Sequence, residues 1–429
     1  MGRFFETATF ACAVLLVAST ARADDLSLQS VVKLALTRNE RAEIADQSVI
    51  SADAAVSKAR AAFLPSISLS ANETLRPQEV ENNGRVALRS NAASAALTVS
   101  QSLLNAGAFP LYSAAKHSYE SARFSHDDQR RQLAFDAARS FFSVVAQQRV
   151  LKAANSRRDL AAATLNDTQV RASSGLVSSN DVTRSEIERA SAEQSTINAG
   201  NSLQAARLNL EYLIAAPLEI DADLAAPTQT LAPDNQSLPG LVNLAIATRP
   251  DLAALRANAA SASALADEPG LRFVPTLSAA AQARTQDQAI VGDRYVDTTL
   301  TLNFNWQIWD GGSRSADASS RTAAHRAAEL QLRSLARRVE TDVRVAVAEL
   351  SAARAALVAA QQGQDAARRS EEETSVLYKQ GLAKAIELVN GNSSKFDAEV
   401  AVAAAELNVR QAELDLRSAL GLFPLDGFQ

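Results

Sequence analysis

The sequence is internally duplicated, because short motifs in its first half return in the same order in its second half. Pro65 and Pro275 each precede a stretch of alternating side chains, and they are 210 residues apart. Gly175 and Gly381 are each followed by Leu and are 206 residues apart. Repetition at a nearly constant spacing indicates two structural units of one kind. The other matching motifs are SLLNAG and QIWDGG, YLIAAP and ALGLFP, and LALTRN and AIATRP.

The first 23 residues have the pattern of a secretory signal peptide. Arg3 precedes an apolar run from Ala8 to Ala18, which is too short to span a membrane as a helix. The sequence ARA at 21–23 has the small residues of a cleavage site, so we expect residues 1–23 to be removed. Cys12, the one cysteine, lies in this segment, and the mature chain is therefore expected to have no disulfide.

The charge and composition exclude several classes of protein. The formal net charge is −5 and no long basic run is present, which argues against nucleic acid as a partner. After residue 23 no stretch approaches the ~18 apolar residues of a membrane-spanning helix, but an exported chain can also contribute strands to a closed barrel. Aromatic residues make up only 5% of the chain, which favours closely packed helices over a thick globular core.

Each half predicts the same order of elements. A helix (about 28–60 and 238–266) precedes a strand, a polar loop and a second strand. The clearest strand signal is Leu300–Ile308, where apolar and uncharged polar residues alternate. Two readings fit this alternation: a soluble sheet with its apolar face buried, or a barrel wall between lipid and water.

A long helix follows in each half, about 108–174 and 313–380. At ~1.5 Å per residue, a helix of this length extends about 100 Å, beyond any ordinary globular domain. Apolar residues in the second helix recur every three or four positions, which predicts a coiled-coil seam. These seam positions are Leu332, Leu335, Val339, Val343, Ala346, Leu350, Ala353 and Leu357.

Gly175 and Gly381 fall where each long helix must end and reverse. Glycine after the last helical residue adopts the left-handed conformation that terminates a helix. Asp181 and Glu387 each lie six residues later, in the first turns of the predicted returning helices, about 180–213 and 386–421. Negative charge is favourable there. Each Gly-Leu pair is therefore predicted to form the tip of a helical hairpin.

The duplicated motifs resemble those of the TolC family of outer-membrane channels, the exit ducts of tripartite efflux and type I secretion systems. The resemblance covers essentially the whole mature chain. It implies a mainly α protein with transmembrane β structure, in which each protomer of a homotrimer gives four strands to one twelve-stranded outer-membrane barrel. A long α-helical coiled-coil tunnel then extends into the periplasm. The motifs that carry it are AAFLPSISLS, SQSLLNAG, SGLVSSNDV and YLIAAP, with LRFVPTLSAA, FNWQIWDGG, QGLAKAIEL and ALGLFP.

The expected organisation follows from the motifs and the resemblance together. The expected parts are a signal peptide (1–23), a first repeat (24–217, with strand pair 64–104 and tip near 175), a linker or equatorial segment (218–240), a second repeat (241–424, with strand pair 274–309 and tip near 381) and a C-terminal tail (425–429).

In this family the tunnel narrows at its tip, and the resemblance implies roles for residues near Gly381. Tyr378 and Glu387 match the family's tyrosine and its first acidic residue. Asn390 stands where a second acidic residue is common, so the implied constriction consists of Glu387 and Asn390. Three Glu387 carboxylates would form an acidic ring that favours cations.

The resemblance also implies contacts that hold the tip closed. Asp181 matches an aspartate of the first hairpin that helps to hold the tip closed, which implies a link between Asp181 and Tyr378. Ala383 replaces the family's arginine, and the adjacent Lys384 is a candidate substitute. Without the resemblance, Asp181 and Glu387 are equally explained as charges that stabilise helix N-termini, and Tyr378 as a packing residue.

The sequence predicts neither an enzyme nor a cofactor or metal site. His117 and His126 are nine residues apart and do not form an i, i+4 metal pair, and His325 is remote from both. The partners implied by the resemblance are a periplasmic adaptor, an inner-membrane transporter of the RND or ABC type, and outer-membrane lipid. Two alternatives are a periplasmic adaptor protein and a coiled-coil protein without a pore. The transported substrate is not indicated.

Overall fold

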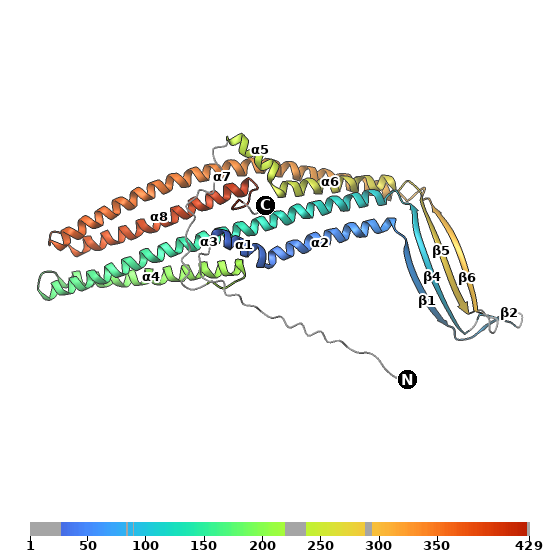
Figure 1. Cartoon of the computed structure of the whole chain (residues 1–429), viewed down its shortest axis with the longest axis horizontal. Coiled ribbons are helices and arrows are strands. Elements are labelled where there is room, and N and C mark those ends of the chain that lie inside the picture. Colours follow the sequence, from blue (N-terminus) through green and yellow to red (C-terminus); the bar gives the residue numbers. More distant parts are fainter. Residues whose placement is uncertain (1–26, 83–84, 89, 219–236, 288–293, 427–429) are drawn as a thin grey trace.

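The computed structural model describes residues 27–82, 85–88, 90–218, 237–287 and 294–426. The molecule is elongated, with its strands at one end and two helical hairpin tips at the other (Figure 1). The signal peptide expected at 1–23, most of the linker expected at 218–240 and the end of the tail lie outside the described residues.

The expected order of elements is present in both halves. The first half contains α1 (Leu28–Arg38), α2 (Glu40–Arg60), the short 3₁₀ helix η1 (Ala61–Phe63), β1 (Ser66–Leu75), β2 (Val80–Asn82), β3 (Arg85–Leu88), β4 (Asn91–Leu104), α3 (Ala108–Ser173) and α4 (Ser179–Ile214). The second half contains α5 (Leu238–Thr248), α6 (Pro250–Leu271), β5 (Thr276–Asp287), β6 (Arg294–Asn305), α7 (Ser313–Lys379) and α8 (Ala385–Ala419).

The first helix of each half is broken, whereas the sequence predicted one continuous helix. Asn39 has an extended backbone, and its side chain caps α2 by accepting from the Arg41 backbone N–H at 2.9 Å. Its amide also donates to the carbonyl oxygen of Leu213 at 2.9 Å. In the second half Arg249 is extended because it precedes Pro250. Both breaks lie beside the ends of the returning helices.

The four long strands form one antiparallel sheet in the order β1-β4-β5-β6. β6 was expected to continue to Ile308 but ends at Asn305, which pairs with Thr276. The residue before Thr276 is Pro275, which has no N–H to continue the ladder. β1 and β6 are the two edges of the sheet.

The register gives the sheet one apolar and one polar face, as the alternation predicted. Cross-strand partners share a face, and Ile67 opposes Val99 while Ala281 opposes Leu300. The apolar face is exposed in the single chain, and Leu300 is 82% accessible. The opposite face carries Ser66, Ser68, Thr98, Ser100, Gln282, Thr299 and Thr301.

The predicted coiled-coil seam of α7 is confirmed from Leu335 to Ala353, whereas Leu332 and Leu357, at its predicted ends, lie outside the buried cluster. Val339, Val343, Ala346 and Leu350 are buried in a cluster with residues of α5 and α8, and Leu335 and Ala353 pack against it. A second cluster joins α1 to α3 and the ends of α4 and α8 around Leu133, Phe135 and Phe141. None of the described helices contains a stretch long and apolar enough to cross a membrane.

Candidate functional site

Each hairpin turns at the glycine that the sequence singled out. Gly175 and Gly381 have φ values of +74° and +77°, in the left-handed region that favours glycine. Beyond each glycine, the backbone N–H of Leu176 bonds to Arg171 at 2.9 Å, and that of Leu382 bonds to Leu377 at 2.8 Å. This pattern satisfies carbonyl groups that a helix end would otherwise leave unpaired.

Both tips expose a leucine directly after the glycine. Leu176 is 74% accessible and Leu382 is 72% accessible. The tips lie together at the end of the molecule farthest from the sheet (Figure 1). Two exposed apolar side chains at equivalent turns are a candidate contact for another protein.

Tyr378 is buried between the two hairpins, with 4% of its surface accessible. Its hydroxyl lies 3.4 Å from the Thr168 hydroxyl of α3, and the Arg171 guanidinium stacks 4.6 Å from its ring centroid. Burial away from water, reinforced by the Asp167 carboxylate, raises the pKa of the Tyr378 hydroxyl above its usual value. Tyr378 therefore joins the second hairpin to the first as a neutral group.

Asp181 has a different partner from the one that the resemblance implied. Its carboxylate accepts from the Ser178 backbone N–H at 3.2 Å and the Ser178 hydroxyl at 2.9 Å. The Ser178 hydroxyl in turn accepts from the Asp181 N–H, which completes a capping box at the start of α4. In this arrangement Asp181 stabilises its own helix, and Tyr378 bonds to Thr168 instead.

The remaining predicted tip residues are exposed. Lys384 is the N-cap of α8 and makes no side-chain capping bond. Glu387 and Asn390 are exposed in the first turns of α8. Since they are three residues apart, they lie on one face of the helix. The geometry therefore presents a carboxylate and an amide on a common exposed surface.

A row of arginines on α3, which sequence reasoning missed, connects the first hairpin to the second. Their partners lie more than 200 residues away in sequence, so no local pattern could reveal them. The contacts run from the middle of the molecule to the tip. They are Arg131 to the Ser418 carbonyl (2.9 Å), Arg139 to Asp415 (2.6 Å), Arg149 to Glu406, Arg157 stacked on Phe396 (5.0 Å) and Arg171 stacked on Tyr378 (4.6 Å).

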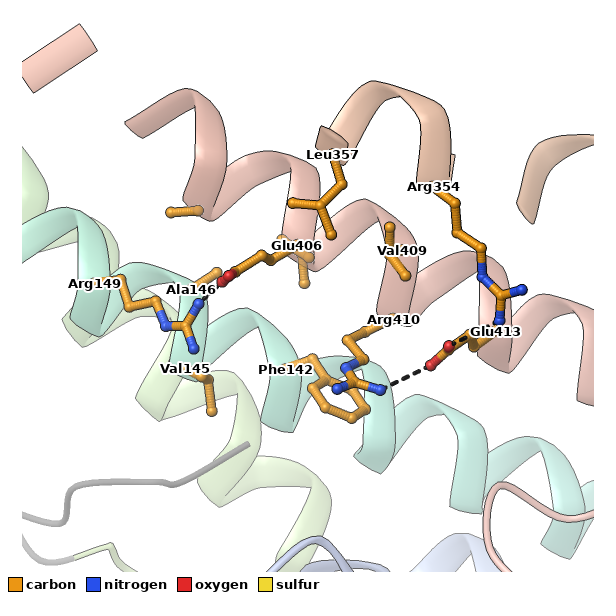
Figure 2. Close-up of a pocket in the computed structure, with 12 residues that line it drawn as sticks. Phe142, Val145, Ala146, Arg149, Arg354, Leu357, Glu406, Val409, Arg410 and Glu413 are labelled. Carbon is orange, nitrogen blue, oxygen red and sulfur yellow. Dashed lines mark hydrogen bonds and ion pairs between the residues drawn. The ribbon is translucent and has the colours of Figure 1, made fainter. Parts of the chain in front are cut away.

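A cavity of about 570 Å³ lies between α3, α7 and α8. Figure 2 shows Arg149 reaching it from α3 and Arg354 from α7. Its charged groups are paired: Arg149 with Glu406, and Arg410 with the buried Glu413 at 2.9 Å. The cavity thus lies along the contact between the hairpins, which the pair of Arg149 and Glu406 joins, whereas Arg410 and Glu413 pair within α8.

Within the described ranges, no group of three or more His, Cys, Asp or Glu side chains could hold a metal ion. The candidate functional features are therefore a sheet with an exposed apolar face, a pair of long hairpins, and a tip where Tyr378, Glu387 and the two exposed leucines gather.

Comparison with known proteins agrees with this architecture. A family model described as outer membrane efflux protein matches residues 31–216 and 241–422. Among solved structures, the chain is similar to the Campylobacter jejuni CmeC outer membrane channel, with 16% identity and a TM-score of 0.80 over 93% of this chain and 86% of that one. No match was found among curated proteins.

Two further solved structures share the fold. VceC from Vibrio cholerae has 16% identity and a TM-score of 0.77, covering 93% of this chain and 97% of that one. The open state of the Neisseria gonorrhoeae MtrE outer membrane channel has 21% identity and a TM-score of 0.78, covering 96% and 94%. The family's members are channels rather than enzymes. Because the family model covers both repeats, the chain belongs to the outer membrane efflux protein family, the TolC-like channels that lie in the outer membrane and extend into the periplasm.

Proposed function

We propose that three copies of this chain form the passive exit duct of a tripartite efflux or type I secretion system. The carrying observation is the sheet, which exposes an apolar face and leaves β1 and β6 as open edges. An open edge in lipid would leave backbone groups without hydrogen bonds. When three sheets join edge to edge into one closed barrel, the backbone groups of each edge form hydrogen bonds with the next sheet. The apolar faces then point to lipid.

The hairpins of the three copies then form a tunnel across the periplasm. Its tip docks a periplasmic adaptor, which connects the duct to an inner-membrane transporter of the RND or ABC type. The exposed Leu176 and Leu382 support this assignment, because apolar side chains at both tips offer a contact for another helical protein. In this proposal the duct is passive and the transporter supplies the energy.

We place the constriction at Glu387 and Asn390, which share an exposed face of α8. Three Glu387 carboxylates around the threefold axis attract cations and repel anions. Contacts of Tyr378 hold the tip closed in this proposal, and Asp181 and Lys384 take part when neighbouring copies meet. The open state named for the MtrE channel supports a duct that can open.

The first experiment is electron microscopy of protein extracted with detergent from the outer-membrane fraction, together with its mass. We expect a tapered tube with threefold symmetry, about 100 Å or more in length. A soluble monomer would contradict the proposal. The apolar face of the sheet would then have to be buried by something other than lipid.

Planar-bilayer conductance tests the constriction separately. Glu387→Gln is expected to lower cation preference severalfold, whereas Glu186→Gln, an exposed glutamate on α4, serves as the matched control and leaves it unchanged. Equal ion selectivity in wild type and Glu387→Gln would remove Glu387 from the constriction.

A further inference from the structure

The two junctions between sheet and helices correspond residue by residue. In the first repeat the Gln101 side chain donates to the carbonyl oxygen of Phe63 at 3.0 Å. In the second repeat the Trp306 indole donates to the carbonyl oxygen of Phe273 at 3.1 Å. These pairs stand at the spacings of the duplicated Pro and Gly landmarks. Equivalent side chains therefore donate to equivalent carbonyl oxygens in the two repeats. The residues around them can be matched at the same spacings.

In the second repeat the junction contains a closed network of ion pairs. Glu268 of α6 is buried and forms ion pairs with Arg272 at 2.7 Å and with Arg321 of α7 at 3.0 Å. Arg272 also reaches Asp317 at 2.8 Å. Every cation at this junction thus has a carboxylate partner within the chain.

The first repeat places cations at the matching positions without the acids. Lys58 of α2 stands where the second repeat has Glu268, and Lys116 of α3 stands where it has Arg321. Tyr112 replaces Asp317, and the Lys116 ammonium lies 5.4 Å from its ring centroid. In the part of the chain that the structure describes, neither lysine has an ion-pair partner.

Among the described residues, the other charged side chains near these lysines form no ion pair with them. Arg60, two residues after Lys58, is exposed and also has no ion pair among the described residues. Glu120, one turn beyond Lys116, bonds to His117 at 3.0 Å. Lys58, Arg60 and Lys116 outnumber the Glu120 carboxylate, and this excess of positive charge attracts an anion.

Three aromatic residues, of which Phe109 is exposed, lie next to the cluster on the side of the sheet. Phe63 packs against Phe109 and Tyr112, with ring centroids 5.1 and 6.0 Å apart. Phe109 is 60% accessible although it is large and apolar. Aromatic residues at the end of an apolar band are typical of the depth of lipid headgroups. The anions at that depth are lipid phosphates.

We propose that Lys58, Arg60 and Lys116 bind the phosphate of an anionic phospholipid in the periplasmic leaflet of the outer membrane. The proposal rests on the membrane position of the sheet given above. The lipid's acyl chains lie against the aromatic cluster and the apolar face, while its phosphate lies against the exposed Lys58, Arg60 and Lys116 side chains. The first repeat thus obtains from the membrane the negative charge that the second repeat supplies itself.

The test is native mass spectrometry of the detergent-extracted oligomer with added phosphatidylglycerol, and with phosphatidylcholine as the zwitterionic comparison. Wild type is expected to retain phosphatidylglycerol selectively. The double variant Lys58→Gln/Lys116→Gln should lower that affinity roughly 30-fold, because each near-surface lysine contributes about a fivefold attraction to anionic lipid. The matched control is Lys33→Gln/Lys152→Gln, which removes two exposed lysines away from the junction.

Three outcomes overturn the proposal. Equal phosphatidylglycerol retention by wild type and the junction variant shows that these lysines do not hold the lipid. Competition by millimolar inorganic phosphate shows a general phosphate site. Loss of the oligomer in the junction variant, with unchanged lipid retention, shows that the lysines meet a carboxylate of another copy. Failure of the duct proposal appears differently, as wild type that is neither in the outer-membrane fraction nor oligomeric.

Discussion

At the first hairpin tip, Ser178 and Asp181 cap α4 through each other's backbone N–H groups, whereas at the second tip Lys384 begins α8 without a side-chain cap. The second tip is instead held from outside, by the contacts of Tyr378 with Thr168 and Arg171 of α3. The first tip thus carries its own stabilisation, and the second depends on its neighbour. A change that separates the hairpins should loosen the second tip first.

Near the middle of the molecule each repeat has a corner, where the break in its first helix, at Asn39 or Arg249, meets the end of its returning helix, α4 or α8. The two corners also differ in the contacts that hold them. The ends of α4 and α8 turn alike, with Ala215 and Gly421 in the left-handed conformation, and the carbonyl oxygens of Leu213 and Leu420 each accept a bond from the break in the first helix of their own repeat. The first accepts from the Asn39 amide at 2.9 Å, and the second accepts from the Thr248 hydroxyl at 2.5 Å. At the second corner, Gly421 also lies directly against the backbone of Arg249. The two repeats therefore join these elements with different residues and different bonds.

The largest expected effect comes from Gly421→Ala, which would damage the second corner alone. An added Cβ would lie 2.8 Å from the Arg249 Cα, and Gly421 has a φ of +74°. Overpacking and the left-handed backbone together should cost about 3 kcal/mol. Gly175→Ala is the control, because its φ is also +74° but its surroundings are open, so it should cost only about 1 kcal/mol. Equal losses in thermal unfolding would show that the close approach is unimportant.

Asn39→Ala should damage the first corner by about 2 kcal/mol, because it removes the cap of α2 and the bond to Leu213. Asn39→Asp separates the two roles, since an aspartate keeps the cap but cannot donate to the carbonyl. Chemical denaturation is the measurement. If Asn39→Asp had the same free energy of unfolding as wild type, only the cap would matter.

Tyr378→Phe should loosen the second tip by about 1 kcal/mol at neutral pH, because it removes the hydroxyl contact with Thr168. The pKa of Tyr378 is raised by burial, so its stabilising contribution is present below pH ~10 and is lost as the pH rises through the folded-state value. The difference between wild type and Tyr378→Phe should therefore shrink above pH ~10. A constant difference up to pH ~11 would contradict the buried position.

The smallest effect tests the caps themselves. Ser178→Ala should weaken the first tip by about 1 kcal/mol, and Lys384→Ser should strengthen the second by somewhat less, about 0.5 kcal/mol. Hydrogen exchange of the backbone amides in the first turns of α4 and α8 measures each tip separately. If Lys384→Ser left exchange in α8 unchanged, the absence of a cap would not explain the weaker second tip.

Much of the fold followed from local pattern. Helical spacing located the seam from Leu335 to Ala353, alternation located the two faces of the sheet, and the glycines located the turns. These features depend on residues close together in sequence. The breaks at Asn39 and Arg249 did not follow, because the Asn39 amide is committed to Leu213, 174 residues away.

The tip was only partly predictable for the same reason. Burial of Tyr378 and its bond to Thr168 join residues 210 apart, and the expected partner Asp181 is already used by Ser178 next to it. In the sequence, the arginines of α3 are indistinguishable from an ordinary charged helix face. Their role becomes visible only in the structure, where α8 lies beside α3. The roles of Glu387, Asn390 and Lys384 depend on neighbouring copies and remain predictions.

The cluster around α1 also contains the other end of the described chain. Leu28 and Val31 share one hydrophobic cluster with Leu414, and Phe423 and Leu425 pack against it. The path of the chain therefore closes nearly into a ring. A circularly permuted protein that begins at Leu238 and ends near Ala216, with a short peptide joining the present ends, would keep every hairpin, strand pairing and corner intact. Which repeat is synthesised first is then a matter of gene order, and the architecture does not depend on it.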